Sequence, residues 1–515
     1  MDKRVRVRFA PSPTGPLNIG GLRTALYDYL FARKHGGDFI LRIEDTDKNR
    51  EVPGTEDYIM KALNWVGISP DEYPGVGGEK EEKYGPYRQS ERKDMYLKYA
   101  LQLIEQGHAY YAFDTSEEID AMRKAEEEKG NPGAKYNHAT RDGMKNSLNL
   151  SSSEVEELKQ LGKNVVIRLK MPVDETIEFT DIVREQVSFQ TSLLDDKVMI
   201  KADGMPTYHL ANIVDDHLME ISHVIRGEEW LSSTAHHIYM YKCLNWDPPH
   251  FAHLSLLLKP VGKGKLSKRD SATFGFPVFP LNWANPENGE LQFEGFKEYG
   301  FIPEALINFL AFLGWNPGTE QEIFTMEQLI QAFSLDKVVK SGARFDIEKA
   351  KWYNQQYLMA MSNEDLAAAI SSDFANVPNE KLQIFCGLMK ERVENLNEFK
   401  TKGYFFFEQP KEWDRKTIRK KYKEENDEHF LAMAEALQNL DAFELEGIQN
   451  IVKNYIGEHE LGFGNILPIY RIALTGTMKG PDIFATMELL GKEESLNRLK
   501  DGLRLFKEFQ KEDNA

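Results

Sequence analysis

The sequence of 515 residues predicts an α/β domain at the N-terminus, an insertion within that domain, and all-helical domains at the C-terminus. Three observations predict this fold class. A strand, a helix and a second strand follow one another within residues 4–47, residues 116–163 form a charged block of different composition, and apolar residues beyond Thr273 recur at helical period. A chain of this length is also too long for one hydrophobic core, so several domains are expected.

The N-terminal unit is a candidate nucleotide site. Arginines alternate with apolar residues over residues 4–9, which predicts a strand, and the prolines and glycines of residues 11–21 exclude regular structure in the following loop. Apolar residues from Leu22 to Leu30 recur on one face of a helix, and residues 39–43 form a second strand that delivers Glu44 at its end. Ligands of parallel sheets bind beyond these strand ends. Gly20 and Gly21 at the helix start would let a nucleotide approach the backbone.

Two motifs resemble those of the glutamyl-tRNA synthetases, which are class I aminoacyl-tRNA synthetases. Residues 17–21 (LNIGG) stand where that class carries its HIGH motif, and residues 265–269 (KLSKR) stand where it carries KMSKS. The two motifs are roughly 245 positions apart and in the right order. Weaker matches at GPYRQSER, PTYHLANIVDD, VIRGEEW and RIALTG extend the resemblance over nearly the whole chain. The resemblance implies a Rossmann-type nucleotide-binding domain, an inserted α+β connective domain that contacts the acceptor stem of tRNA, and helical anticodon-binding domains.

We therefore expect six segments. They are residues 1–113 (first half of the Rossmann catalytic domain), 114–200 (inserted connective domain), 201–258 (second catalytic half), 259–345 (lysine loop and stem-contact domain), 346–410 (first anticodon-binding helical domain) and 411–515 (second such domain). Helical period occurs in six C-terminal stretches, at residues 305–313, 326–333, 364–370, 381–393, 428–437 and 444–455. In the resembled family, bacterial-type enzymes have a helical anticodon-binding region, glutaminyl and archaeal-type enzymes have β-barrels, and a truncated tRNA-modifying relative lacks the region.

The two motifs predict an ATP site. An ATP whose α-phosphate is attacked needs positive charge near the departing pyrophosphate, and Lys265 and Lys268 on a glycine-containing loop could supply it. A solvated basic loop is the alternative interpretation, and the first motif argues against it. The residues predicted to be catalytic are Asn18, Gly20, Gly21, Lys265 and Lys268. The residues predicted to bind ATP are Pro11, Ser12, Thr14, Gly15, Asn18, Gly20, Gly21, Glu229, Lys265, Leu266, Ser267, Lys268 and Arg269.

A pocket for glutamate is predicted beside the nucleotide. Arg8 and Arg226 each end a predicted strand, so their guanidinium groups could bind carboxylates, and Glu44 could bind the ammonium. Without the resemblance, the arginines could equally be surface strand ends, and Tyr208 and Trp230 would be read as core or rim aromatics. By resemblance, the glutamate pocket comprises Arg8, Ala10, Ser12, Glu44, Tyr208, Asn212, Arg226 and Trp230. A guanidinium that faces the side-chain carboxylate would explain rejection of glutamine.

Asn18 departs from the family pattern, which normally has His as the first letter of HIGH. Asn can donate a hydrogen bond toward a phosphate, but it cannot carry charge or a proton. Loss of a whole transition-state donor lowers a rate by about 10² to 10³, so a partial replacement should cost less. We expect activity to survive this substitution.

Composition limits the remaining possibilities. The 64 Lys and Arg against 82 Asp and Glu give a net charge of −18, which argues against nonspecific nucleic-acid binding, whereas a shaped tRNA site on one basic face remains possible. Basic residues cluster at 337–351 and 415–423. Two cysteines cannot build a disulfide framework or the Cys-based zinc site that some relatives carry. No apolar run reaches membrane-spanning length and no signal peptide precedes the first strand, so we expect a cytoplasmic protein. We also expect a monomer with no metal ligated by the protein.

The resemblance implies an enzyme that joins L-glutamate to tRNA(Glu). ATP and glutamate would first form glutamyl-adenylate with the help of Mg²⁺, and the 3′-terminal adenosine of the tRNA would then take the glutamyl group. One alternative is a noncatalytic RNA-binding paralogue, which only Asn18 favours and which the lysine loop opposes. Another is a relaxed enzyme that also charges tRNA(Gln), and the sequence leaves this choice open.

Overall fold

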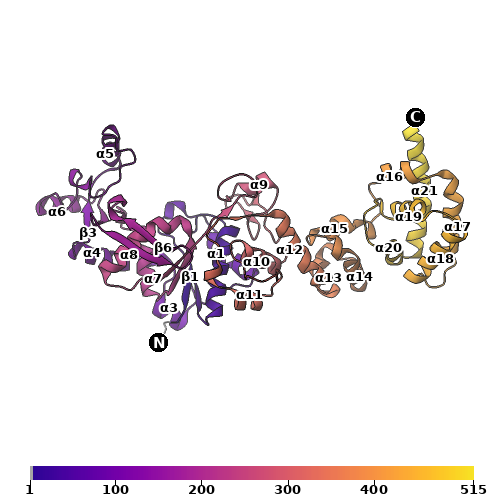
Figure 1. The fold of residues 1–515 in the computed structure, drawn as a ribbon, viewed down its shortest axis with the longest axis horizontal. Helices are drawn as coiled ribbons and strands as arrows, with labels where there is room; N and C mark the ends of the chain where they lie inside the picture. Colours follow the sequence, from indigo (N-terminus) through magenta and orange to yellow (C-terminus); the bar gives the residue numbers. More distant parts are fainter. Residues whose placement is uncertain (1–3, 515) are drawn as a thin grey trace. The chain divides into compact units, whose positions relative to one another are not determined.

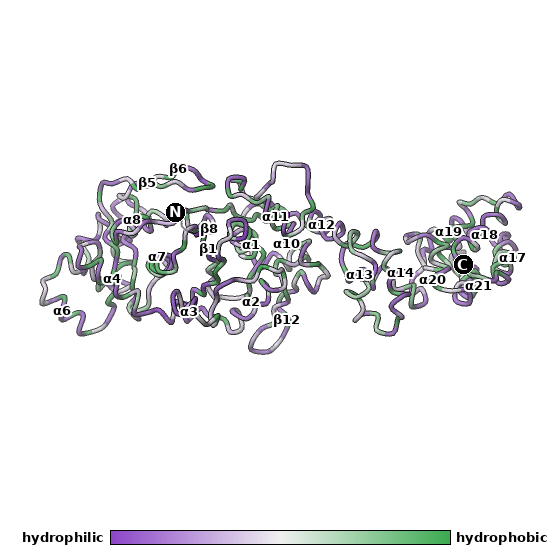
Figure 2. Tube along the Cα trace, turned by 90° about the horizontal axis from the view of Figure 1, so that it is seen from below, coloured by the Kyte–Doolittle hydropathy of each residue, from purple (hydrophilic) through white to green (hydrophobic). Residues whose placement is uncertain are grey.

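The computed structural model describes residues 4–514, which form two compact units. The first unit reaches to Phe296 and includes Leu306–Ile347, whereas the second comprises Lys297–Ala305 and continues from Glu348 (Figure 1). Hydrophobic stretches of chain lie inside each unit, and hydrophilic segments such as α3 (Gly78–Tyr84) lie at the outside (Figure 2).

Parallel strands form the centre of the first unit. β1 (Arg6–Phe9) pairs in parallel with β2 (Asp38–Leu41), and β8 (His223–Gly227) pairs in parallel with β9 (His250–Leu254). Ser222, just before β8, donates its backbone N–H to the Arg6 carbonyl oxygen (2.9 Å), so the two strand pairs meet at their N-terminal ends. The helices of this region are α1 (Ile19–Lys34), α2 (Thr55–Trp65), α4 (Lys93–Glu105), α7 (Tyr208–Leu218) and α8 (Leu231–Leu244), of which α1 connects β1 to β2 and α8 connects β8 to β9. The predicted α/β fold class is confirmed.

Part of the predicted insertion joins the central sheet. β3 (Ala109–Ala112), β4 (Val166–Leu169) and β7 (Val198–Ile200) make a separate antiparallel sheet, and α5 (Ser116–Glu128) and α6 (Ser152–Leu161) lie between β3 and β4 in sequence. β5 (Thr176–Asp181) and β6 (Glu185–Gln190) instead continue the sheet of β8 and β9, because Asp181 pairs in parallel with Phe251. Residues 176–181 alternate exposed and buried along the strand, which is the pattern that anchors it on a core face.

The lysine loop follows the sheet. β10 (Leu257–Leu258) pairs with β13 (Ala343–Arg344), and the loop leads into α9 (Asp270–Phe274). β11 (Trp283–Ala284) and β12 (Leu291–Phe293) form a small antiparallel pair. Two of the predicted helices follow as α10 (Pro303–Phe312) and α11 (Met326–Ala332).

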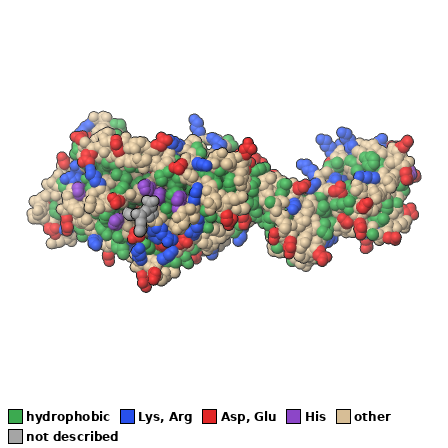
Figure 3. Space-filling view, turned by 60° about the horizontal axis from the view of Figure 1, so that its bottom comes forward, with side chains coloured by type: hydrophobic (Ala, Val, Ile, Leu, Met, Phe, Trp, Pro, Cys, Tyr) green, Lys and Arg blue, Asp and Glu red, His purple; other side chains and the backbone are tan. Residues whose placement is uncertain are grey.

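The second unit is helical throughout its described residues, as predicted from the sequence. Its helices are α12 (Ile347–Ala360), α13 (Asn363–Ile370), α14 (Asn379–Met389), α15 (Asn397–Gly403), α16 (Arg415–Lys421), α17 (Asp427–Gln438), α18 (Leu445–Glu458), α19 (Phe463–Thr475), α20 (Ile483–Leu490) and α21 (Lys492–Asn514). The core of the C-terminal helices buries Ile448, Val452, Ile472 and Phe506. Lys and Arg side chains gather on part of the surface of this unit (Figure 3), and most of those on α16 are exposed.

Candidate active site

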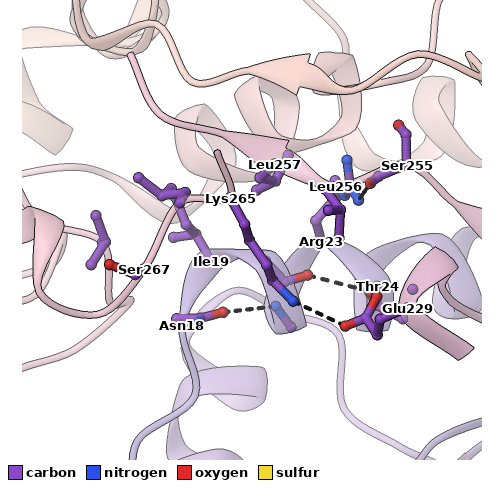
Figure 4. Close-up of a pocket in the computed structure, with 15 residues that line it drawn as sticks. Asn18, Ile19, Arg23, Thr24, Glu229, Ser255, Leu256, Leu257, Lys265 and Ser267 are labelled. Atoms are coloured by element: carbon purple, nitrogen blue, oxygen red, sulfur yellow. Dashed lines mark hydrogen bonds and ion pairs between the residues drawn. The ribbon is translucent and has the colours of Figure 1, made fainter. Parts of the chain in front are cut away.

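The first motif lies at the start of α1 and lines a cavity of about 220 Å³. Asn18 is the N-cap of the helix, and its Oδ1 accepts the backbone N–H of Gly21 at 3.0 Å (Figure 4). A β-carbon at Gly21 would lie 2.6 Å from Leu17 Cδ1, so any larger residue there would displace the Leu17 side chain. The helix N-terminus therefore faces the cavity, with its partial positive charge available to an anion.

The lysine loop forms the opposite wall of this cavity. Leu266 donates its N–H to the Leu257 carbonyl oxygen (2.7 Å), which holds the loop against the end of the sheet. Lys265 Nζ lies 3.0 Å from Glu229 Oε1 (Figure 4). Lys268 Nζ lies 2.8 Å from the position that a β-carbon at Gly15 would occupy, and partial burial lowers the pKa of Lys268. Lys265 therefore lines the first cavity, whereas Lys268 lies beside Gly15 in the loop that precedes the first motif.

The structure brings some of the predicted ATP residues together and not others. Asn18, Gly20, Gly21, Glu229, Lys265, Leu266 and Ser267 line the cavity. Ser12 and Thr14 line the neighbouring cavity, and Gly15 contacts Lys268. Pro11 and Arg269 line neither of these cavities.

A second cavity of about 530 Å³ adjoins the first, because Thr24 and Gly227 line both. It contains all the residues predicted to bind glutamate except Asn212, namely Arg8, Ala10, Ser12, Glu44, Tyr208, Arg226 and Trp230. Asn212 is buried on α7, one turn after Tyr208, and its side-chain amide has no hydrogen-bond partner among the described residues.

The two arginines of the second cavity have different partners. Arg8 donates through Nε and Nη2 to the two carboxylate oxygens of Asp216 (3.0 and 3.3 Å). Arg226 is equally buried, but it donates to His253 Nε2 (3.0 Å) and to the Tyr208 hydroxyl (2.9 Å). Its Nη2 donates to Thr234 Oγ1 (2.8 Å). The charge of Arg8 is compensated by the protein, whereas the partners of Arg226 are neutral groups.

Glu44 is the buried carboxyl group of the second cavity. Its Oε1 accepts from Arg42 Nη2 at 3.1 Å and from Gln89 Nε2 at 3.5 Å. Burial raises the pKa of Glu44 to about 7, although Arg42 and Arg8 favour the ionised form. A positively charged ligand would add a further favourable partner and ionise the group fully.

Comparisons with known proteins show which family the chain belongs to. Residues 4–352 match the family model described as tRNA synthetases class I (E and Q), catalytic domain, and residues 347–503 match an anticodon binding domain. The chain is 53% identical to a glutamate–tRNA ligase of Christiangramia forsetii, over 98% of this chain and 100% of the relative. It is 52% identical to that of Flavobacterium johnsoniae, over 98% and 99%.

A crystal structure of a glutamate tRNA ligase from Elizabethkingia meningosepticum in complex with its amino acid superposes with a TM-score of 0.92, at 49% identity over 98% of this chain and 99% of that one. The chain belongs to the glutamate–tRNA ligase family of class I tRNA synthetases. Membership of this class implies ATP as a substrate. The two cavities described above adjoin one another within the matched catalytic domain.

Several buried residues that line the cavities or contact their lining residues were not predicted from the sequence. Arg42 and Asp216 lie beneath the second cavity, and Arg42 Nη1 donates to Asp216 Oδ1 at 2.7 Å. Arg23 lines the first cavity and donates to the backbone carbonyl oxygens of Leu313 (2.8 Å) and Ser255. Arg42 lies within the predicted second strand, residues 39–43, and two residues before Glu44, so its position near the site could have been inferred from the sequence.

Within residues 4–514, no helix has the length and apolar character needed to cross a membrane.

Proposed function

We propose that the chain attaches L-glutamate to tRNA(Glu) in two steps. One observation carries this proposal: a buried guanidinium with neutral partners, Arg226, and a buried carboxyl group, Glu44, face the same cavity beside the nucleotide site. Glutamate offers carboxylates for the first group and an ammonium for the second. We assign the side-chain carboxylate to Arg226, because a neutral amide would leave this buried charge without compensation.

In the first step, an oxygen of the glutamate α-carboxylate attacks the α-phosphorus of ATP, and pyrophosphate leaves. Lys265 and Lys268 stabilise the charge that develops on the pyrophosphate, and Asn18 offers its amide N–H to a phosphate. In the second step, the 2′-hydroxyl of the terminal adenosine attacks the acyl carbon of glutamyl-adenylate, and AMP leaves. Proximity of the two cavities and charge stabilisation account for the rate without a dedicated general base.

Mg²⁺ is proposed to accompany ATP. Mg²⁺ keeps several waters and is usually held by substrate phosphates with one or two carboxylates. Among the residues that line the first cavity, Glu229 supplies a carboxylate, and it is held by Lys265. The cavity therefore fits a metal ion that arrives with ATP, which would neutralise part of the phosphate charge.

The proposed tRNA surface includes the basic residues of α16 and those at 337–351. Arg415, Lys416 and Lys420 are exposed on one helix of the unit that contains the matched anticodon binding domain. Phosphate contacts made by such side chains support affinity without reading sequence. We further propose a monomer that acts in the cytoplasm.

The experiment combines pyrophosphate exchange with aminoacylation. Purified protein is incubated with glutamate, ATP and labelled pyrophosphate, with and without tRNA, and then with isolated tRNA(Glu) or tRNA(Gln). Exchange and charging of tRNA(Glu) are expected. No exchange under either condition would favour a noncatalytic RNA-binding paralogue, and equal charging of both tRNAs would show a relaxed enzyme. A sedimentation measurement tests the monomer.

A further inference from the structure

Arg226 is linked through the imidazole of His253 to the buried carboxylate of Asp181. Its Nε donates to His253 Nε2 at 3.0 Å, and His253 Nδ1 lies 2.6 Å from Asp181 Oδ2. The side chains of His253 and Asp181 are 0% exposed. Asp181 belongs to β5, within the segment that the sequence assigns to the insertion, whereas His253 and Arg226 belong to β9 and β8.

The protonation of His253 follows from its contacts with Arg226 and Asp181. Thr234 Oγ1 also lies 3.1 Å from Nε2, and its hydroxyl can donate there or to the Trp230 carbonyl oxygen (3.0 Å). A guanidinium nitrogen can only donate, so His253 Nε2 must carry no proton and must accept. The proton of the neutral ring then lies on Nδ1 and points at Asp181, which accepts it. Burial lowers the pKa of His253 to about 4, so the ring is neutral at physiological pH.

The same logic applies to a second imidazole on the other side of Arg226. His237 Nδ1 lies 3.3 Å from Arg226 Nη2, and His237 Nε2 lies 3.3 Å from His209 Nδ1. Burial holds the pKa of His237 well below its usual value and lowers that of His209 to about 3. Two neutral rings therefore accept from Arg226 without cancelling its charge.

We propose that Asp181 and His253 are positioning residues for Arg226: Asp181 selects the His253 tautomer that accepts from Arg226 and so orients the guanidinium toward the substrate carboxylate. This inference rests on the proposed binding of glutamate. A carboxylate placed directly on Arg226 would neutralise it, as Asp216 does for Arg8. The interposed imidazole orients the guanidinium while leaving its charge for the substrate.

Asp181 can be replaced by Asn, which has nearly the same size, and the neighbouring backbone donors determine how the Asn amide is oriented. Its Oδ1 accepts three backbone N–H groups, from Val183 (2.9 Å), Arg184 (2.8 Å) and His253 (3.2 Å). In Asp181→Asn, these three donors require the amide oxygen at that position, so the NH₂ group must face His253 Nδ1. The ring then carries its proton on Nε2, where it opposes the Arg226 Nε–H. A wrong tautomer of this kind keeps the side chains in place but removes the hydrogen bond that His253 accepts from Arg226.

The test is a double-mutant cycle read by calorimetric titration of L-glutamate into the full-length protein. Asp181→Asn should weaken glutamate binding about tenfold or more, because a hydrogen bond to a charged group is lost. His253→Gln offers an amide oxygen near the position of Nε2 and should stay within about threefold of the wild type. An amide has no tautomers, so Asp181→Asn should have no further effect in the His253→Gln background. The KM for ATP should not change in any variant.

Two results would overturn the inference. One is wild-type affinity in Asp181→Asn, and the other is an equal loss from Asp181→Asn in both backgrounds, which would indicate a merely structural role. If thermal melts show that Asp181→Asn does not fold, the glutamate affinities of His253→Gln and His253→Met are compared instead. Only Met removes the acceptor for Arg226, so only His253→Met should bind glutamate more weakly. Equal affinities of those two variants would also refute the inference. Failure of the wild type to bind glutamate would instead refute the proposed function.

Discussion

The affinity for glutamate should depend on pH through Glu44. Its pKa is raised to about 7 by burial, so the carboxyl group is half protonated near neutrality in the absence of ligand. The substrate ammonium needs the ionised form. Protonated Glu44 must lose its proton on binding, so affinity should fall as the pH decreases below the pKa and should level off above it.

The size of this effect follows from the pKa. With a value of about 7, roughly ten in eleven molecules are ionised at pH 8 and one in eleven at pH 6, which predicts about tenfold weaker binding at pH 6. Three buried histidines near Arg226 do not interfere in this range. The pKa of His209 is lowered to about 3, that of His253 to about 4, and that of His237 well below its usual value.

The assay is calorimetric titration of L-glutamate between pH 6 and pH 8 in buffers of different ionisation enthalpy. Release of about one proton on binding is expected at pH 6 and almost none at pH 8. Glu44→Gln should bind about 10- to 150-fold more weakly at pH 8, because the charge-assisted contact is worth about 1.5–3 kcal/mol, and it should lose the pH dependence. An affinity that stays constant from pH 6 to pH 8 in the wild type would refute the reasoning.

A matched control for Glu44→Gln is Glu56→Gln. Glu56 Oε1 accepts from Arg88 Nη2 at 2.6 Å, and Glu56 is absent from the linings of both cavities. The control changes the same net charge, so wild-type affinity and wild-type pH dependence are expected.

Three other substitutions test the nucleotide site. Asn18→His removes the cap that Oδ1 provides to Gly21, so the free energy of unfolding should fall by about 1 kcal/mol. The rate of pyrophosphate exchange should rise about tenfold. An unchanged exchange rate would contradict a phosphate contact by residue 18. Gly15→Ala should raise the KM for ATP, because its β-carbon would lie 2.8 Å from Lys268 Nζ. Gly36→Ala is the control for a substitution at positive φ: Gly36 has open space around it, so the KM for ATP should not change. Lys268→Gln should lower kcat by about 10² to 10³ without changing calorimetric glutamate affinity, and a loss confined to glutamate binding would contradict its assignment to the pyrophosphate.

The periodic elements were predictable from sequence because one face of each is buried. Residues 326–333, predicted as a helix, correspond to α11 (Met326–Ala332), and residues 428–437 correspond to α17 (Asp427–Gln438). The last helices were harder to find for different reasons. Pro468 lies inside α19, and α20 is buried on nearly every side, so it shows no polar face. The spacing of Leu496, Leu499 and Leu503 in α21 is typical of a helix with one buried face, although no helix was predicted there.

The candidate site was predictable as a set of residues but not as a set of interactions. Asn18, Lys265 and Glu229 were predicted together as ATP-binding residues, and all three line the first cavity. No local pattern indicates that Arg8 is bound by Asp216, because the two lie on β1 and α7 and meet only after the chain has folded. The pairing of β5 with β9, which brings Asp181 to His253, is likewise a contact between distant segments.

These long-range partners decide what each arginine can do. Arg8 and Arg226 are the same residue type, are nearly equally buried and line one cavity. Asp216 pairs with the first and also with Arg42, so these three side chains form a buried ionic cluster. The second keeps its charge because imidazole and hydroxyl groups surround it. In the proposed function, a substrate carboxylate would compensate that charge, whereas the amide of glutamine would leave it buried and unpaired, and sites of this kind discriminate by about 10⁴ to 10⁵. We therefore propose that the arginine without a carboxylate partner selects the amino acid.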